Sequence, residues 1–130
     1  VFGYSKSMRF DAVINPFCFR AQMNQKLRIN GTGDQRRPFI HIDRAAKVLS
    51  QVTADSIEPG TYDLLEKNLS IGEIVESLSS IYPELEMIYV NRHMKMRELL
   101  VTPDERLKAL LPDSFNLESD LRDFQEHFAF

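Results

Sequence analysis

Five of the 16 Lys and Arg residues lie in two short stretches of this sequence, and their types and spacing suit a phosphate-bearing ligand. One stretch follows a glycine turn and the other follows an apolar segment; together they hold Arg36, Arg37, Arg92, Lys95 and Arg97. A guanidinium group presents a planar fork that can hold two phosphate oxygens at once, which makes the arginines the stronger candidates. Taken alone, each arginine is explained better by a surface ion pair, so its position in the fold has to decide between the two interpretations.

The glycine turn itself, Gly31–Gly33, is not predicted to hold a dinucleotide. A dinucleotide-binding loop has a third glycine, follows a buried strand and opens a helix whose N-terminus faces the pyrophosphate. Here an extended segment follows the turn instead. We therefore interpret the turn as a connection between two strands.

Metal and disulfide chemistry have little support in the sequence. His41 and Asp43 alternate along one predicted strand face, but two ligands without a cysteine or a further nearby histidine make a weak metal site. We expect a hydrogen-bonded structural histidine and a helix-capping aspartate instead. Cys18 is the single cysteine, which excludes an internal disulfide, and its apolar neighbours predict a buried packing position.

Size and charge narrow the class of protein. The chain has 130 residues, the length of one domain, with 43% apolar residues and a formal net charge of −3. This charge gives no overall positive field for nucleic acid, and a local basic cluster suits a small anion better. The apolar runs are too short to cross a bilayer, and no signal peptide is visible. We expect a cytoplasmic protein that binds neither nucleic acid nor a membrane.

Helices and strands alternate along the chain, which predicts an α/β or α+β domain. Apolar residues at helical spacing predict helices within 11–25, 43–53, 70–81, 102–111 and 115–124. Short apolar or alternating runs predict strands at 26–30, 38–42, 61–65 and 84–90. We expect Asp11 to cap the first helix, with Asn15-Pro16 as a second possible start, and Asp43 to cap the next. Capping boxes are predicted at 70–73 and 102–105.

These residues, in their order, resemble the C-terminal half of the extended short-chain dehydrogenase/reductase family, which contains NAD-dependent nucleotide-sugar epimerases and dehydratases. The segment GTGDQRRPFIHIDRAAKVL is similar to the family's two glycines, arginine and alternating strand before a helix. VFGYS is similar to its Asn-Val-Tyr-Gly-Pro segment, and TYDLLEKNLSIGEIV to its Val-Tyr-Asn-Val-Gly and Ser-x-x-Glu-Leu segments. FNLESDLRDF resembles its last helix, so the similarity extends over essentially the whole chain.

The resemblance implies a fold: the small α+β substrate-binding region of a Rossmann-type epimerase, occupying residues 1–130. The family's glycine-rich cofactor loop and its catalytic Tyr-x-x-x-Lys pair precede the segment at which this chain begins. We therefore expect a C-terminal fragment with no catalytic residues, no metal and no tightly bound cofactor. NAD or NADP would belong to an N-terminal Rossmann half of the parent protein.

The resemblance also implies a site for a nucleotide-diphosphate sugar. By its place in the motif, Arg37 corresponds to the arginine that contacts the substrate diphosphate. Arg92 corresponds to a second arginine that contacts phosphate or ribose, with Arg97 as the alternative. The segment with Asp11, Val13 and Asn15 resembles the family's substrate-lining loop and helix start, where backbone N–H groups can meet phosphate oxygens. Ile29 lies on a strand that, in the family, borders the nucleotide base.

The leading hypothesis is therefore the substrate-binding part of an NAD-dependent nucleotide-sugar epimerase or dehydratase. The alternative is a non-catalytic interaction module built on the same scaffold, and the sequence leaves both open. Without a cofactor half against them, the helix at 43–53 and the strand at 61–65 lose part of their apolar cover. We therefore expect a homo-oligomer.

Overall fold

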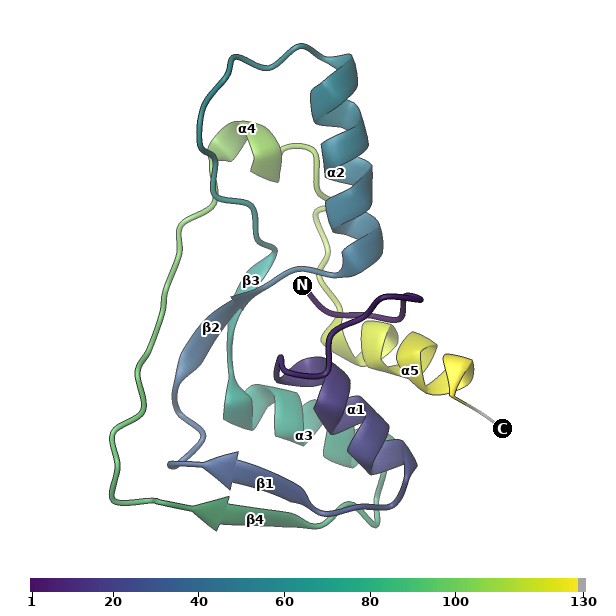
Figure 1. Cartoon of the computed structure of the whole chain (residues 1–130), viewed down its shortest axis with the longest axis vertical. Coiled ribbons are helices and arrows are strands. Elements are labelled where there is room, and N and C mark those ends of the chain that lie inside the picture. The colour runs from purple at the N-terminus through teal and green to yellow at the C-terminus, as the bar shows by residue number, and fades with distance from the viewer. Residues whose placement is uncertain (129–130) are drawn as a thin grey trace.

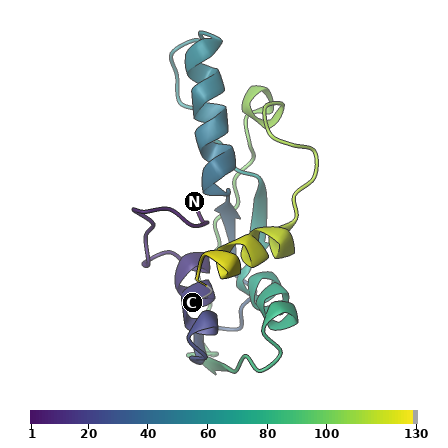
Figure 2. The same ribbon diagram turned by 90° about the vertical axis from the view of Figure 1, so that its right-hand side faces the viewer.

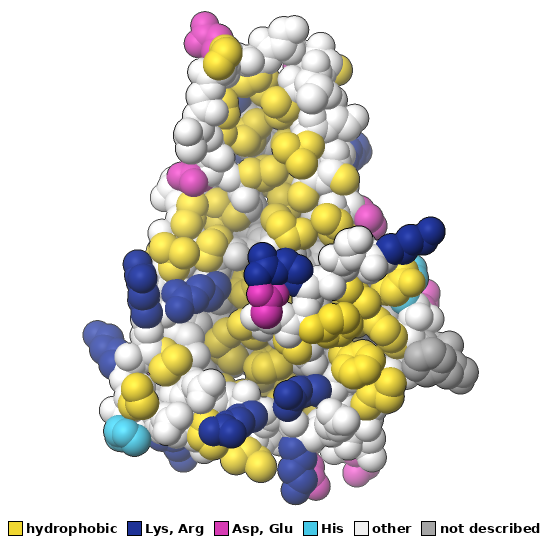
Figure 3. All heavy atoms as spheres, in the orientation of Figure 1, with side chains coloured by type: hydrophobic (Ala, Val, Ile, Leu, Met, Phe, Trp, Pro, Cys, Tyr) yellow, Lys and Arg dark blue, Asp and Glu magenta, His cyan; other side chains and the backbone are white. Residues whose placement is uncertain are grey.

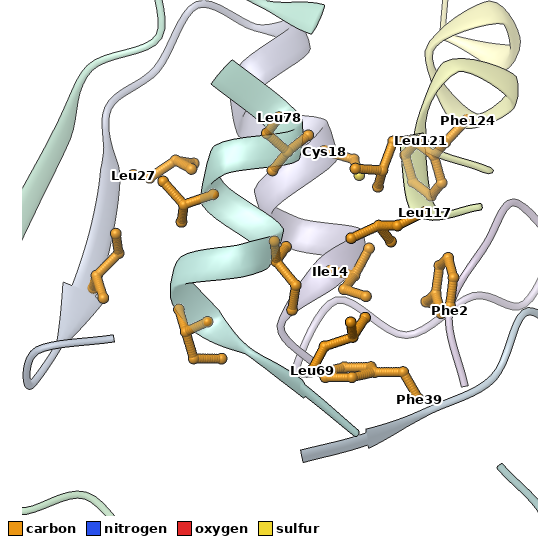
Figure 4. Close-up of a cluster of buried hydrophobic side chains, with 14 residues drawn as sticks. Phe2, Ile14, Cys18, Leu27, Phe39, Leu69, Leu78, Leu117, Leu121 and Phe124 are labelled. Carbon is orange, nitrogen blue, oxygen red and sulfur yellow. The ribbon is translucent and has the colours of Figure 1, made fainter. Parts of the chain in front are cut away.

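Helix α3 (Ile71–Ile81) lies at the centre of the core in the computed structural model of the chain, which describes residues 1–128. Its apolar stripe is covered, and Ile74 and Leu78 are completely buried. Helices α1 (Ile14–Gln22) and α5 (Leu117–His127) pack against α3 and against each other. Figures 1 and 4 show how the three helices surround a common set of buried side chains.

The four short strands in the described part of the chain form two separate two-stranded sheets. β1 (Leu27–Asn30) pairs in parallel with β4 (Met87–Val90). β2 (Arg36–Phe39) pairs antiparallel with β3 (Lys67–Ser70). Alternate residues of β1 are buried, so one face of its sheet covers the core. This combination of helices with small parallel and antiparallel sheets confirms the predicted fold class.

The core is apolar, and Cys18 is part of it, as predicted, with 3% of its surface exposed. The N-terminal segment joins the core through Phe2, whose N–H donates to the Ile40 carbonyl (3.0 Å) and whose carbonyl accepts from the Ile42 N–H (2.8 Å). The buried cluster comprises Phe2, Ile14, Cys18, Leu27, Ile29, Phe39, Leu69, Ile71, Ile74, Val75, Leu78, Leu117, Leu121 and Phe124.

Helix α2 (Ile42–Ala54) projects away from the three-helix core, in the direction of the short helix α4 (Glu105–Lys108) (Figures 1 and 2). Ala45 and Val48 on one side of α2 are buried, whereas Leu49 is 62% exposed. One side of this helix therefore presents apolar surface to the solvent.

An ion-pair network fixes the base of α2 to the rest of the molecule. Arg44 in its first turn pairs with Glu66, just before β3, and with Asp120 in α5. The Glu66 side chain is only 4% exposed, and it also accepts the His41 N–H (2.9 Å). The network therefore joins three segments that are distant in sequence.

The first helix begins later and ends earlier than the predicted range 11–25. Its N-cap is Val13, which offers no side-chain cap, and Asp11 is instead paired with Arg9, so the prediction that Asp11 caps this helix is wrong. Pro16 lies in the first helical turn, where its missing N–H leaves no hydrogen bond unmade. The second possible start, at Asn15-Pro16, is therefore the closer prediction.

His41, not Asp43, caps helix α2. The chain becomes helical at Ile42, and the His41 Nδ1 accepts the Asp43 N–H (3.3 Å). The early helical turn also shortens the predicted strand at 38–42, so His41 and Asp43 do not share a strand face. His41 is a buried, hydrogen-bonded histidine as expected, although its Nε2 has no partner among the described residues.

Two further predictions about local structure are wrong, and one is confirmed. Residues 61–65 form no strand, because they are tied to a neighbouring segment by a single backbone bond, from the Asp104 N–H to the Asp63 carbonyl (2.9 Å), and not by a ladder. No capping box forms at 102–105, since α4 begins at Glu105 and Asp104 is its cap. The predicted box at 70–73 is confirmed: Ser70 and Glu73 accept each other's N–H groups at 3.0 and 2.7 Å.

Within residues 1–128, no helix combines the length and apolarity that crossing a membrane requires. Over the same range, no group of three or more His, Cys, Asp or Glu side chains is arranged to hold a metal ion.

Candidate functional site

The parallel strands β1 and β4 end at the same edge, and a hollow lies beyond this edge. Their last residues, Asn30 and Val90, are register partners, and the Gly31 N–H donates to the Val90 carbonyl (2.8 Å). The turn at 31–35 and the loop at 91–98 follow, and together they enclose about 680 Å³. We call this space the loop hollow. Ligands of sheets with parallel strands commonly bind beyond the carboxyl ends of the strands.

Glycine is required in the turn because another part of the hollow's wall lies against it. Gly31 and Gly33 have φ of +78° and +88°, a conformation that favours glycine. A Cβ on Gly31 would lie 2.6 Å from the Cγ of Met96. The glycines therefore allow the loop at 91–98 to approach the turn closely.

The loop at 91–98 is held at both ends. At its start the Met94 N–H donates to the Asn91 carbonyl (2.9 Å), which closes a turn directly after β4. At its end the Leu99 N–H donates to the Arg36 carbonyl (3.0 Å). The second contact brings β2, and with it the Arg36-Arg37 pair, beside the loop.

Several cationic side chains that have no ion-pair partner within the described part of the chain lie around the loop hollow and the adjoining strand β2. Within residues 1–128, no ion pair involves any of the basic candidates from the sequence, Arg36, Arg37, Arg92, Lys95 and Arg97. The surface ion pair that best explained each arginine in isolation is therefore not present here. Asp34 and Glu98 also line the hollow, so its net charge is only modestly positive and suits a small anion. In Figure 3 Lys and Arg side chains gather mainly over the lower half of the molecule, where β1, β4 and this loop lie.

Arg36 and Arg37 point to opposite faces of β2. Arg37 is the register partner of the buried Leu69, so it shares the face that covers the core and is half-buried there. Arg36 lies on the other face and is exposed. The hydrogen bond from the Ser70 N–H, helped by the charges of Arg36 and Lys67, lowers the pKa of Glu73. Arg36 therefore already acts on the Glu73 carboxylate.

The N-terminus of α3 is close to the glycine turn, but its N–H groups are already used. The Ile71 N–H donates to the Gln35 carbonyl (3.3 Å) and the Gly72 N–H to the Gly33 carbonyl (2.9 Å). The capping box satisfies the remaining first-turn donors. An anion near this turn would therefore depend on arginine side chains and not on this helix end.

A second, smaller hollow of about 490 Å³ lies at the N-terminal segment, and we call it the N-terminal hollow. Its polar lining includes Ser5, Ser7, Arg9, Asp11 and Asn15. The hydrogen bond from Arg9 holds the pKa of Asp11 below its usual value. Both side chains are exposed, so this pair is easily rearranged by a ligand.

The other predicted residues in this region have structural surroundings. Asn15 is 3% exposed, its Oδ1 accepts the Gly3 N–H (3.0 Å) and its Nδ2 donates to the Arg9 carbonyl (3.0 Å). The amide therefore organises the segment that lines the N-terminal hollow. Val13 is the helix N-cap beside it. Ile29 is 1% exposed, so its strand borders the loop hollow while its own side chain packs in the core.

Most of the predicted site residues lie at one or the other of the two hollows. The segment that contains β2 runs from the loop hollow to the N-terminal hollow. Arg92 and Arg97 line the loop hollow, and Asp11 and Asn15 line the N-terminal hollow. The extended segment from Gln35, at the first hollow, to Ile42, at the second, spans at most roughly 23 Å at about 3.3 Å per residue. Arg37 lies on this segment, between the two hollows.

Sequence reasoning missed several polar residues of both hollows. Thr32, Gln35 and His93 line the loop hollow, and Ser5, Ser7 and Arg9 line the N-terminal hollow. They lie in loops without periodic pattern, so nothing in the sequence marks their position in space. The available signals were adjacency in sequence: His93 follows Arg92, Gln35 precedes Arg36, and Thr32 lies within the glycine turn.

Solved structures with the same fold include nucleotide-sugar epimerases and dehydratases. UDP-N-acetylglucosamine 4-epimerase from Methanobrevibacter ruminantium, in complex with UDP-N-acetylmuramic acid, matches 98% of this chain with a TM-score of 0.77 and 24% identity. The UDP-N-acetylglucosamine 4-epimerase from Bacillus cereus matches 99% with a TM-score of 0.74 and 13% identity. UDP-glucuronic acid 4-epimerase from Bacillus cereus, in complex with UDP-glucuronic acid and NAD, matches 95% with a TM-score of 0.68 and 17% identity.

The chain spans about two fifths of these proteins, covering 43%, 44% and 41% of their respective chains. No protein-family model and no curated protein sequence matches it. Its fold is that of the C-terminal part of the NAD-dependent epimerases and dehydratases of the extended short-chain dehydrogenase/reductase type, which confirms the resemblance stated from the sequence.

Proposed function

We propose that this chain binds the nucleotide-diphosphate sugar of an NAD-dependent epimerase or dehydratase. The observation that carries the proposal is the group of arginines without ion-pair partners, within residues 1–128, beside a hollow at the carboxyl ends of two parallel strands. Two structures with this fold hold UDP-linked sugars, which supports the same class of ligand here.

In this proposal the diphosphate lies against Arg37 on β2 and Arg92 at the loop hollow, with Arg97 as the alternative partner. Charge-assisted, bidentate hydrogen bonds from a guanidinium group are among the strongest that a protein offers to phosphate. The nucleoside lies in the loop hollow, beside the end of the strand that contains Ile29. The sugar extends along β2 toward the N-terminal hollow, where the Asp11–Asn15 segment and the nearby serine hydroxyls can meet its hydroxyl groups.

The NAD of such an enzyme would be held by a part of the protein other than residues 1–128. A dinucleotide needs a glycine-rich turn that opens a helix. The Gly31–Gly33 turn leads into β2 instead, and the nearest helix end, that of α3, has used its N–H groups. These residues do not fit a dinucleotide pyrophosphate, so we assign them no step of hydride transfer. Their contribution is to bind the substrate and orient its sugar.

Isothermal titration of the chain with UDP and with UDP-N-acetylglucosamine tests the proposal. We expect both ligands to bind and the affinity to fall with rising salt, because the phosphate contacts are ionic. NAD titrated under the same conditions should show no micromolar binding. Absence of UDP binding at millimolar ligand, with the chain folded by circular dichroism, would refute the proposed function.

The alternative function, a non-catalytic interaction module, has one observation in its favour. Helix α2 exposes apolar surface at Leu49 and Ala46, which a protein partner could cover. A chain that fails to bind UDP but associates through α2 would support the module over the enzyme part.

A further inference from the structure

Tyr89, near the end of β4, faces the guanidinium group of Arg92. The Arg92 Cζ lies 5.9 Å from the centroid of the Tyr89 ring. We propose that Tyr89 is a positioning residue, whose ring holds Arg92 at the loop hollow so that the guanidinium is already in place when a nucleotide phosphate arrives. The inference rests on the proposed function and adds to it a residue that acts through Arg92.

The Tyr89 ring has a defined position of its own. Tyr89 is the register partner of the buried Ile29, so its side chain lies on the covered face of the β1–β4 sheet. A Cβ on Gly33 would lie 3.6 Å from the ring carbon Cε1, and the Tyr89 hydroxyl lies 3.9 Å from the Met87 sulfur. The side chain is nevertheless 37% exposed. The ring is therefore supported along its edge while it remains open to a cation.

The backbone after β4 folds Arg92 back toward this ring. Asn91 has φ of +54°, in the left-handed region that asparagine tolerates better than most residues. The turn is closed by the Met94 N–H, which donates to the Asn91 carbonyl (2.9 Å). The Asn91 side chain reaches across to Asn30 on the neighbouring strand, at 3.4 Å. Both the ring and the turn that presents Arg92 are thus fixed to the strand ends.

A cation–π contact matters here because nothing else in the described residues restrains the Arg92 side chain. It forms no ion pair within residues 1–128, and it is exposed. An arginine loses considerable rotamer freedom when it binds a ligand, and restraint before binding reduces that loss. The ring therefore raises phosphate affinity without touching the phosphate itself.

The chain contains a matched control for this contact. The Arg106 Cζ lies 4.7 Å from the centroid of the Tyr62 ring, so this pair has the same chemistry. Arg106 belongs to α4 and is also paired with Asp104. Neither Tyr62 nor Arg106 lines the loop hollow or the N-terminal hollow. Removal of the Tyr62 ring should therefore leave nucleotide affinity unchanged.

The test is calorimetric titration of UDP into the chain and into the variants Tyr89→Leu, Tyr89→Phe and Tyr62→Leu. From the strength of exposed cation–π contacts, Tyr89→Leu should raise the Kd about two- to fivefold. Tyr89→Phe should restore affinity to near that of the unchanged chain, because it keeps the ring. Tyr62→Leu should have no effect. In an Arg92→Gln background Tyr89→Leu should change nothing further, since the positioned group is gone.

The outcomes separate this inference from the proposed function. If the unchanged chain does not bind UDP, both are overturned. If it binds UDP but Tyr89→Leu binds equally well, or loses as much affinity in the Arg92→Gln background as alone, only the positioning role is overturned. Loss of affinity in Tyr89→Phe as large as in Tyr89→Leu would equally overturn it, because the ring would then not be the active feature. Circular dichroism establishes that each variant is folded.

Discussion

Two adjacent arginines on β2 differ in ways that bear directly on ligand binding. Arg37 is half-buried on the core-covering face between the two hollows, whereas Arg36 is exposed on the opposite face near Glu73. A charge-assisted bidentate bond contributes roughly 1.5–3 kcal/mol. We therefore predict that Arg37→Ala weakens binding of UDP-N-acetylglucosamine on the order of tenfold to a hundredfold, as measured by calorimetric titration.

Arg36→Ala is the matched control, since it removes the same charge one residue away. We expect it to change the affinity by less than about threefold, because screened charge without direct contact contributes little. Equal losses in the two variants would show that overall charge, and not a contact from Arg37, attracts the nucleotide.

Burial makes Cys18 unreactive in the native protein. The thiol is 3% exposed, and burial raises the pKa of Cys18 to about 12. Because the thiolate is the reactive form, almost none is present at pH 8 in the folded chain. We predict that Ellman's reagent labels Cys18 only at the rate of unfolding, and that guanidinium chloride accelerates labelling by orders of magnitude. Labelling within seconds in native buffer would contradict the burial of this residue.

The capping box of α3 gives this element a pH dependence. The hydrogen bond from the Ser70 N–H, assisted by Arg36 and Lys67, lowers the pKa of Glu73 below its ordinary 4.5 in the folded state. A lowered pKa stabilises the fold above the unfolded-state pKa, and the stabilisation is lost as the pH falls through the folded value. We predict that Glu73→Gln lowers the free energy of unfolding by about 0.5–1 kcal/mol at pH 7. The difference should shrink below pH 4.5 in urea titrations.

Glu76→Gln, on the same helix, is the control for this prediction. Its carboxylate is exposed and makes no hydrogen bond or ion pair within the described residues. The free energy of unfolding of Glu76→Gln should therefore equal that of the unchanged chain both at pH 7 and below pH 4.5. A Glu73→Gln deficit that stays constant down to pH 3 would show that the carboxylate charge is not the stabilising feature.

Some elements that are determined by neighbouring residues were predicted correctly from the sequence, whereas some that depend on distant residues were not. The box at 70–73 was predictable because every group in it lies within one helical turn. The strand predicted at 61–65 was wrong because a strand needs a partner, and β2 pairs with residues 67–70 instead. Asp43 was a reasonable cap by residue type, but the buried His41 takes that role through tertiary contacts with Phe2 and Glu66.

At the scale of the whole molecule, the sequence identifies candidate site residues but not their grouping. Arg92 and Arg97 are close in sequence and share the loop hollow. Their proximity to Arg36 depends on long-range contacts such as the hydrogen bond from the Leu99 N–H to the Arg36 carbonyl, which no local sequence pattern predicts. The same is true of Arg44, whose two carboxylate partners come from segments 22 and 76 residues away. Motif resemblance supplied the ligand class, and tertiary structure was needed to separate the two hollows.

The exposed side of α2 predicts self-association of the chain. The unpaired strand edge expected at 61–65 does not exist, so the expected contact through α2 rests on its exposed apolar side chains alone. Figure 3 shows apolar side chains over the upper part of the molecule, where α2, α4 and the segment between α2 and β3 lie. The Leu49 side chain is 62% exposed, and its burial in an interface would stabilise a dimer by up to about 2 kcal/mol.

We therefore predict that the chain forms a concentration-dependent dimer, measured by analytical ultracentrifugation, and that Leu49→Lys disrupts it. Ile88→Lys, which removes a 49% exposed apolar side chain from β4, should not disrupt it. If the chain is a monomer at millimolar concentration and binds no hydrophobic dye, the predicted self-association through α2 is wrong.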